Sequence, residues 1–305
     1  MALRDVRRRI RSVKNTAQIT TAMEVVAATK MRRSQGVALA GRPYALAALD
    51  ILKNVARRSP VRPHLLEPRE VKKTLLLVIA SDRGLAGAFN SNVVRLAERW
   101  IREHRGEPYA CAAVGKKVAA SFAARGLASV KTFVGFGDYV ARSDTEPLAA
   151  FLLGGFLRKE WDRVTVFYTN FRTTLKQEVR MIEVLPIHTE RIEETIRGIA
   201  PEYGRYAEIR GEGEAMRYRY EYIFEPSPEA VLERLLPILF KIQLHHLVLE
   251  SNASEHSARM IAMKNASDNA RELVGELTLA YHKARQAGIT RELSEITGST
   301  EAVST

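Results

Sequence analysis

The chain has 305 residues, of which 46% are hydrophobic, enough to bury a core in one large domain or two smaller ones. A single cysteine, Cys111, excludes an intramolecular disulfide framework, and the apolar stretches are too short for a membrane-spanning helix of about 20 residues. Residues 1–58 hold thirteen Lys and Arg against three acidic residues, so +10 of the net charge of +12 lies there. Such a charge attracts nucleic acid, anionic lipid or an acidic protein surface, or else it is a solvated basic face with no partner. Composition does not choose among these four possibilities.

Residues 1–58 are expected to form the first long helix. A mostly apolar stripe there steps by three and four in strict alternation, which is the spacing of a coiled-coil seam. Its positions are Leu3, Val6, Ile10, Val13, Ala17, Thr20, Glu24, Ala27 and Met31. Pro43 lacks an N–H and disfavours helix at the preceding residue, so a kink or break near Arg42 is predicted, with a second helical stretch at 44–58.

A linker and an α/β domain are expected next. Residues 59–70 contain three prolines and are typical of a linker. From 71 to 226, β-rich and helical patterns alternate, which predicts right-handed βαβ units on a mostly parallel, Rossmann-like sheet. The predicted strands are 74–80, 109–115, 130–137 and 163–170, the predicted helices are 91–103, 116–125 and 145–161, and Cys111 is expected to be a buried strand residue. Residues 177–187 and 217–224 indicate further strands at an antiparallel edge, and 200–214 a mobile loop.

The second long helix is expected within residues 227–305. No proline occurs from 238 to 297, and this stretch would extend about 90 Å as a helix, longer than a globular domain requires. Its predicted seam is Met263, Ala266, Ala270, Leu273, Leu277, Ala280, Ala284 and Ala287. An inserted domain brings the ends of the flanking helices together. The predicted fold is therefore an α/β domain inserted between two long terminal helices that form an antiparallel, left-handed coiled coil.

Residues 81–90 follow the first predicted strand, where a phosphate-binding turn would lie. Glycines occur there only at Gly84 and Gly87, so neither a dinucleotide fingerprint nor a P-loop is present. We expect a plain strand-to-helix turn with Asn90 or Ser91 as the helix N-cap.

Three histidines of the second long helix, His245, His246 and His256, are the remaining candidates for a metal site. Their spacing does not combine with nearby Cys or acidic ligands, and we expect them to be solvated or to face a partner. The sequence contains no catalytic motif of the hydrolase or metalloprotease type. It therefore predicts no catalytic residue, no cofactor and no metal.

Both ends of the chain resemble the gamma subunit of the rotary F-type ATP synthase. At the amino end the likeness lies in residues 12–16, 22–31 and 42–44. The turn 81–90 is similar to the Asp-Arg-Gly-Leu-x-Gly stretch of that family. The strongest likeness is in the last helix, at Ser254-Glu255, Ala258-Arg259-Met260, Ala262-Met263-Lys264, Asp268-Asn269 and throughout 284–296.

This resemblance implies a non-catalytic rotor shaft that passes torque between a membrane c-ring and the catalytic α3β3 hexamer of a proton-translocating synthase, with sodium ions as the less common alternative to protons. It implies α, β, epsilon and c subunits as partners, no nucleic acid, and membrane contact only through the complex, on the cytoplasmic face of a bacterial plasma membrane. The implied contacts with the β subunit are Arg285, Gln286, Thr290, Glu292 and Arg259, together with Met23, Lys30, Arg32 and Arg33.

Two other interpretations stay open at this point. A soluble α/β enzyme that dimerises through its terminal coiled coil would require a complete phosphate-binding turn or a catalytic cluster. A nucleic-acid-binding protein would use the basic first helix, and its affinity would fall steeply with salt concentration.

Overall fold

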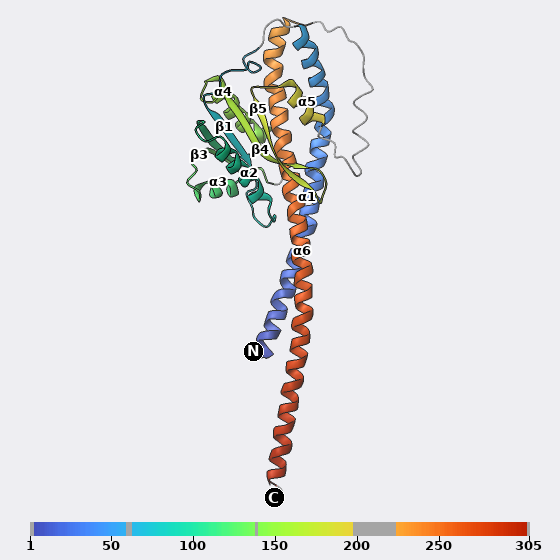
Figure 1. Cartoon of the computed structure of the whole chain (residues 1–305). Helices are drawn as coiled ribbons and strands as arrows, with labels where there is room; N and C mark the ends of the chain where they lie inside the picture. Colours follow the sequence, from blue (N-terminus) through green and yellow to red (C-terminus); the bar gives the residue numbers. More distant parts are fainter. Residues whose placement is uncertain (1–2, 59–62, 138–139, 198–223, 304–305) are drawn as a thin grey trace. The chain divides into compact units, whose positions relative to one another are not determined.

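The structure is a computed structural model that describes residues 3–58, 63–137, 140–197 and 224–303. Two long helices, α1 (Leu3–Arg58) and α6 (Pro228–Val303), flank an α/β domain in the sequence (Figure 1). The domain contains β1 (Thr74–Ile79), α2 (Phe89–Glu103), β2 (Tyr109–Val114), α3 (Lys116–Ala123), β3 (Ser129–Phe133), η1 (Arg142–Thr145), α4 (Glu146–Leu157), β4 (Arg163–Phe171), β5 (Gln177–Leu185) and α5 (Thr189–Arg197). The predicted insertion of an α/β domain between two terminal helices is confirmed, and α5 is an element that was not predicted.

The five strands form one sheet in the order β3-β2-β1-β4-β5. The first four strands are parallel, and β5 pairs antiparallel with β4 at the edge, as predicted for the segment 177–187. Every residue of the central strand β1 is buried, which explains its unbroken apolar sequence. The expected loop at 200–214 and strand at 217–224 lie outside the described residues, apart from Phe224.

Helices cover both faces of the sheet. Alternate residues of β1 point to opposite faces. Leu76 and Val78 belong to a core that includes residues of α2 and α3, and Cys111 of β2 lies in the same core. Leu75, Leu77 and Ile79 belong to the core formed with α4 and with parts of α1 and α6. Burial raises the pKa of the Cys111 thiol to about 11.

α1 continues through Pro43 without a break, so the predicted break near Arg42 is wrong. A proline inside a helix costs about 3 kcal/mol because one backbone hydrogen bond is lost. Downstream of Pro43, Ala45, Leu49 and Leu52 are at most 4% exposed and belong to the core of the α/β domain. Burial of this face offsets the loss. Within the described ranges, no helix is both long and apolar enough to cross a membrane.

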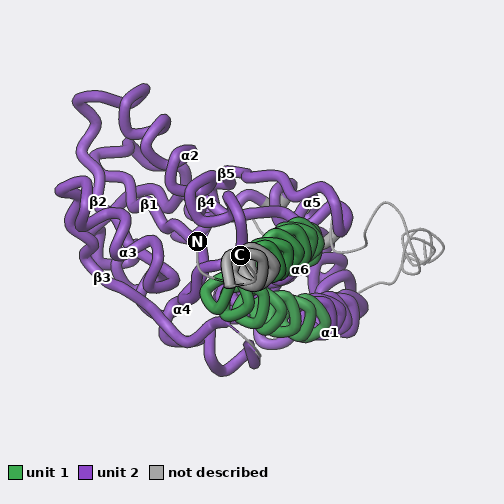
Figure 2. Tube along the Cα trace, turned by 90° about the horizontal axis from the view of Figure 1, so that it is seen from below, with its two compact units in different colours: residues 1–26, 260–305 green, residues 27–259 purple. Residues whose placement is uncertain are grey.

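The chain divides into two compact units, residues 1–26 with 260–305 and residues 27–259, which Figure 2 distinguishes by colour. Unit 1 is the first of these and unit 2 the second. In unit 1 the two helices run antiparallel. The hydroxyl oxygens of Thr21 and Ser267 lie 2.7 Å apart, and a Cβ placed on Gly288 would lie 4.0 Å from Leu3.

The predicted seam of α1 is confirmed, since none of its nine positions is exposed. The predicted seam of α6 is confirmed over its first five positions, since Met263 and Ala270 are buried and Ala266, Leu273 and Leu277 are half-buried. Its last three positions, Ala280, Ala284 and Ala287, are exposed. Part of the covered side instead follows a heptad spacing, at Ser267, Val274, Tyr281 and Gly288. Alanine occurs on both faces of this helix, so the alanine pattern gave the wrong positions towards its end.

Candidate functional site at the carboxyl edge of the sheet

The turn after β1 is braced by a side chain that was expected to cap a helix. α2 begins at Phe89 after Ala88, so the prediction of Asn90 or Ser91 as N-cap is wrong. Asn90 Oδ1 instead accepts hydrogen bonds from the Ser81 backbone N–H at 3.0 Å and from the Ser81 hydroxyl at 2.8 Å. The turn is therefore tied to the first turn of the helix that follows it.

Asp82 occupies the position at the start of α3 where an anion would bind. Its Oδ1 accepts a hydrogen bond from the Lys116 N–H at 2.9 Å, and its Oδ2 accepts one from the Gly135 N–H at 2.8 Å. Gly115, just before α3, has a φ of 100°, and a Cβ there would lie 2.6 Å from the Ala80 carbonyl oxygen. Only glycine allows this close approach. Free N–H groups at a helix start attract phosphate, and here the chain's own carboxylate satisfies one of them.

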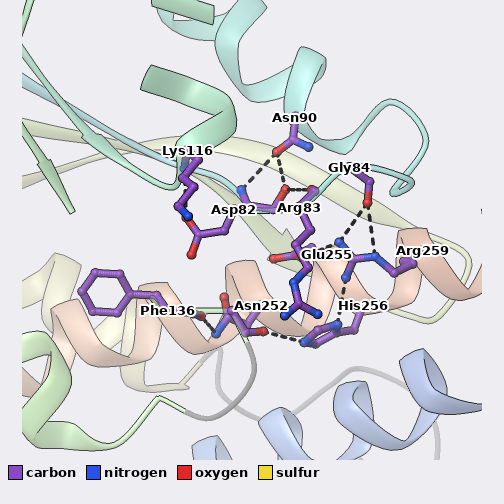
Figure 3. A network of polar contacts seen from close by, with 12 residues as sticks. Asp82, Arg83, Gly84, Asn90, Lys116, Phe136, Asn252, Glu255, His256 and Arg259 are labelled. Carbon is purple, nitrogen blue, oxygen red and sulfur yellow. Dashed lines mark hydrogen bonds and ion pairs between the residues drawn. The ribbon is translucent and has the colours of Figure 1, made fainter. Parts of the chain in front are cut away.

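Arg259 of α6 contacts the same turn (Figure 3). Its Nη2 donates hydrogen bonds to the Gly84 carbonyl oxygen at 3.2 Å and to Glu255 Oε1 at 2.6 Å. Arg259 is only 8% exposed, and Glu255 is 3% exposed. The structure therefore places Arg259, one of the residues predicted to contact a β subunit, in an interior ion pair of unit 2.

Two of the three candidate histidines of α6, His246 and His256, are buried, so the prediction that they are solvated or face a partner is wrong for these two, while His245 is half-buried. His246 is 5% exposed and its Nε2 lies 3.1 Å from Glu250 Oε1, while His256 is 2% exposed. Burial, and next the neighbouring His246, lowers the pKa of His245 to about 4. This part of α6 is enclosed by segments distant in the sequence. Among the described residues, no three His, Cys, Asp or Glu side chains form a cluster that could hold a metal ion.

The other residues predicted to contact a β subunit fall in both units. In unit 1, Arg285, Gln286 and Thr290 are exposed and Met23 is half-buried, while the side chain of Glu292 lies outside the described residues. In unit 2, Arg32 and Arg33 are exposed and Lys30 is half-buried.

α6 extends past the start of its partner helix. Leu3, the first residue of α1, lies against Gly288, and α6 continues to Val303, about four turns further. Thr290 belongs to this extension.

An α/β domain carried between two long terminal helices, one of which covers the carboxyl edge of its sheet, is the architecture of a stalk protein. The family model described as ATP synthase matches residues 2–303. The chain is 41% identical over 303 residues to the ATP synthase gamma chain of Pelotomaculum thermopropionicum, with 99% of each chain covered, and 41% identical to that of Roseiflexus castenholzii, with 98% of each covered. The chain belongs to the ATP synthase gamma chain family.

Solved structures agree with this assignment. The chain superposes with a TM-score of 0.56 on a chain of the mitochondrial ATP synthase central stalk and c-ring of Tetrahymena thermophila, at 25% identity, covering 82% of this chain and 99% of that one. A chain of the Euglena gracilis mitochondrial ATP synthase shares the fold, with a TM-score of 0.64 at 18% identity, covering 99% and 94% of the two chains. These matches favour the gamma chain over the dimeric enzyme and the nucleic-acid-binding protein.

Proposed function

We propose that this gamma chain is the central rotor shaft that passes torque between a proton-driven c-ring and the catalytic α3β3 hexamer. It is a non-catalytic subunit of the synthase. The observation that carries the proposal is the match to gamma chains over 99% of both lengths, which includes both terminal helices. The division into a helix at 1–58, a linker at 59–70, an α/β domain at 71–226 and a helix at 227–305 stays a prediction.

The partners proposed are the α and β subunits, the epsilon subunit and the c-ring, with the complex on the cytoplasmic face of a bacterial plasma membrane. The Tetrahymena structure is of a central stalk together with a c-ring, which supports the c-ring as one partner. The +10 charge of residues 1–58 supports an acidic protein surface as another.

The β-subunit contacts proposed for the end of α6 are Arg285, Gln286, Thr290 and Glu292, and those for α1 are Met23, Lys30, Arg32 and Arg33. Arg285 and Gln286 are exposed, so their hydrogen-bonding groups are accessible to a partner. The planar guanidinium of Arg285 suits a carboxylate, and a charge-assisted bond is stronger than a neutral one. The extension of α6 beyond Leu3 offers further surface for the same partner.

The test replaces Arg285 and Gln286 together by alanine in a complex reconstituted with α3β3. Both side chains are exposed, so the helicity of the isolated chain should not change. ATPase turnover should fall, or assembly should weaken. The matched control is the pair Lys264→Ala and Asn265→Ala, a cation and an amide that are also exposed on α6. If the test pair behaves like the control pair, these two residues do not contact the hexamer. If the unmodified chain does not assemble with α3β3, the rotor function itself is wrong.

A further inference from the structure

The segment of α6 from Ser251 to Arg259 is polar and nevertheless buried. Its buried polar residues are Ser251, Asn252, Ser254, Glu255, His256, Ser257 and Arg259. Burying polar groups costs free energy unless they find hydrogen-bond partners. A helix segment of this composition is therefore suited to a specific, directional contact more than to general hydrophobic packing.

Two of these side chains bind the backbone after β3. Asn252 Nδ2 donates a hydrogen bond to the Phe136 carbonyl oxygen at 2.5 Å, and His256 Nε2 donates one to the Gly137 carbonyl oxygen at 2.9 Å (Figure 3). A carbonyl oxygen only accepts, so the proton of neutral His256 is on Nε2. Nδ1 can then accept the hydrogen bond from Arg259 Nη1, 3.2 Å away.

Other side chains of the segment bind backbone groups near the ends of two more parallel strands. Ser254 Oγ donates to the Thr169 carbonyl oxygen of β4 at 3.1 Å. The guanidinium of Arg259 donates twice to the Gly84 carbonyl oxygen after β1, at 3.2 and 3.4 Å. The segment thus crosses the carboxyl edge of the sheet. In open α/β sheets this edge is where ligands bind, and here the chain's own helix occupies it.

Asp82 holds the turn that carries one of these acceptors. Its carboxylate joins the turn after β1 to the backbone of Lys116 after β2 and of Gly135 after β3. The three turns at the carboxyl edge are therefore cross-linked by one side chain. The Gly84 carbonyl oxygen, two residues from Asp82, is consequently held in a fixed position for Arg259.

We propose that Asn252, His256 and Arg259, together with Asp82, form a positioning joint that holds the α/β domain in one orientation on α6 and so passes torque into the helix. The proposal rests on the rotor function. Arg259 is the last residue of unit 2, and α6 continues from Met260 into unit 1. α6 also packs on the α/β domain earlier in the chain, through Leu236, Phe240 and Leu247. The joint adds directional polar contacts at the end of this packed stretch, so it fixes the orientation of the domain where α6 leaves it.

The joint is tested with Asp82→Asn and Arg259→Lys in the reconstituted complex. Asparagine places an NH2 against one of the two backbone N–H groups, so amide exchange at Lys116 or Gly135 should rise about two- to tenfold, as expected for one lost hydrogen bond. Lysine keeps the charge beside Glu255 but lacks the planar fork that reaches the Gly84 carbonyl oxygen as well. With the hexamer immobilised and a bead on the α/β domain, angular fluctuation between steps should increase in both variants, and fewer protons should be pumped per ATP hydrolysed.

Asp144→Asn and Arg158→Lys are the matched controls. Asp144 also accepts a backbone N–H, from Ala141, and Arg158 also pairs with a glutamate, but both lie outside the joint. Both should keep the wild-type angular fluctuation and pumping ratio. If the joint variants match the controls while amide exchange shows the lost bond, the joint is overturned.

A second pair of variants, at His256, tests the joint even if Asp82→Asn or Arg259→Lys does not assemble. His256→Gln can keep both a donor for Gly137 and an acceptor for Arg259, so the angular fluctuation of the bead should stay at the wild-type level. In His256→Leu both hydrogen bonds are lost, and the angular fluctuation should increase. Equal angular fluctuation in these two variants would also overturn the joint. If the bead on the wild-type complex does not rotate at all, the rotor function is wrong. If the complex rotates but the variants show wild-type angular fluctuation, only the joint is wrong.

Discussion

Gly155→Ala in α4 is expected to lower the stability of the protein because the added methyl group meets a buried indole. A Cβ at Gly155 would lie 2.0 Å from Trp161 Cζ2, closer than any stable contact, so the ring must move. Trp161 is 4% exposed, and its Nε1 donates a hydrogen bond to the Leu152 carbonyl oxygen at 3.1 Å. Overpacking costs about 1–3 kcal/mol and the lost hydrogen bond about 1 kcal/mol, while alanine in a helix recovers about 1 kcal/mol. The expected net loss is about 1–3 kcal/mol.

The neighbouring Gly154→Ala provides the control within the same helix. A Cβ at Gly154 would meet the guanidinium of Arg158, with Nη1 nearest at 3.0 Å, and this flexible side chain is 63% exposed and can move. Gly154→Ala should therefore raise stability by about 0.5–1 kcal/mol. Urea unfolding of the full-length chain, followed by tryptophan fluorescence and circular dichroism, measures both changes. Equal midpoints for the two variants would show that the Trp161 ring adjusts without cost and would refute the packing argument.

Three further predictions concern the helices and the absence of nucleotide chemistry. A cysteine pair at Thr21 and Ser267, whose hydroxyl oxygens are 2.7 Å apart, should form a disulfide within one chain, and dimers on a non-reducing gel would contradict this pairing. Cys111, with a pKa of about 11, stays a thiol at neutral pH, so it should not form a disulfide with either of the introduced cysteines. His245, with a pKa of about 4 when folded, is protonated more readily in the unfolded chain, so its contribution to stability is present above pH 6.5 and is lost as the pH falls towards 4. The wild type should therefore lose about 1–2 kcal/mol more than His245→Gln between pH 7 and 4.5 in urea titrations, after allowance for partial exposure. Calorimetry of the full chain with Mg-ATP should show no specific binding, and a micromolar site would contradict the assignment of Asp82 as the group that fills the anion position.

Elements with a local signal could be predicted from the sequence. β-rich runs located four parallel strands and the antiparallel edge strand, and apolar stripes stepping by three and four located both terminal helices, because each pattern depends on the few residues around it. The terminal motifs also pointed to the gamma subunit family before any contact was known. The polar run from Ser251 to Ser257, which follows a stretch of α6 rich in leucine, was a signal of the joint, and its meaning was missed.

Which groups are buried, and what they contact, follows from the packing of segments that are distant in the sequence. Helix α1 passes through Pro43 because a distant core covers its next turns, and His246 and His256 of α6 are likewise buried by segments distant in the sequence. Asn90 braces a turn instead of capping a helix because Ser81, nine residues earlier, is brought against it. The contact between Arg259 and Gly84 joins positions 175 residues apart, and no periodicity along the chain encodes it. A hydrogen bond depends on the position and direction of both partners in space, and the sequence specifies these only through the complete fold.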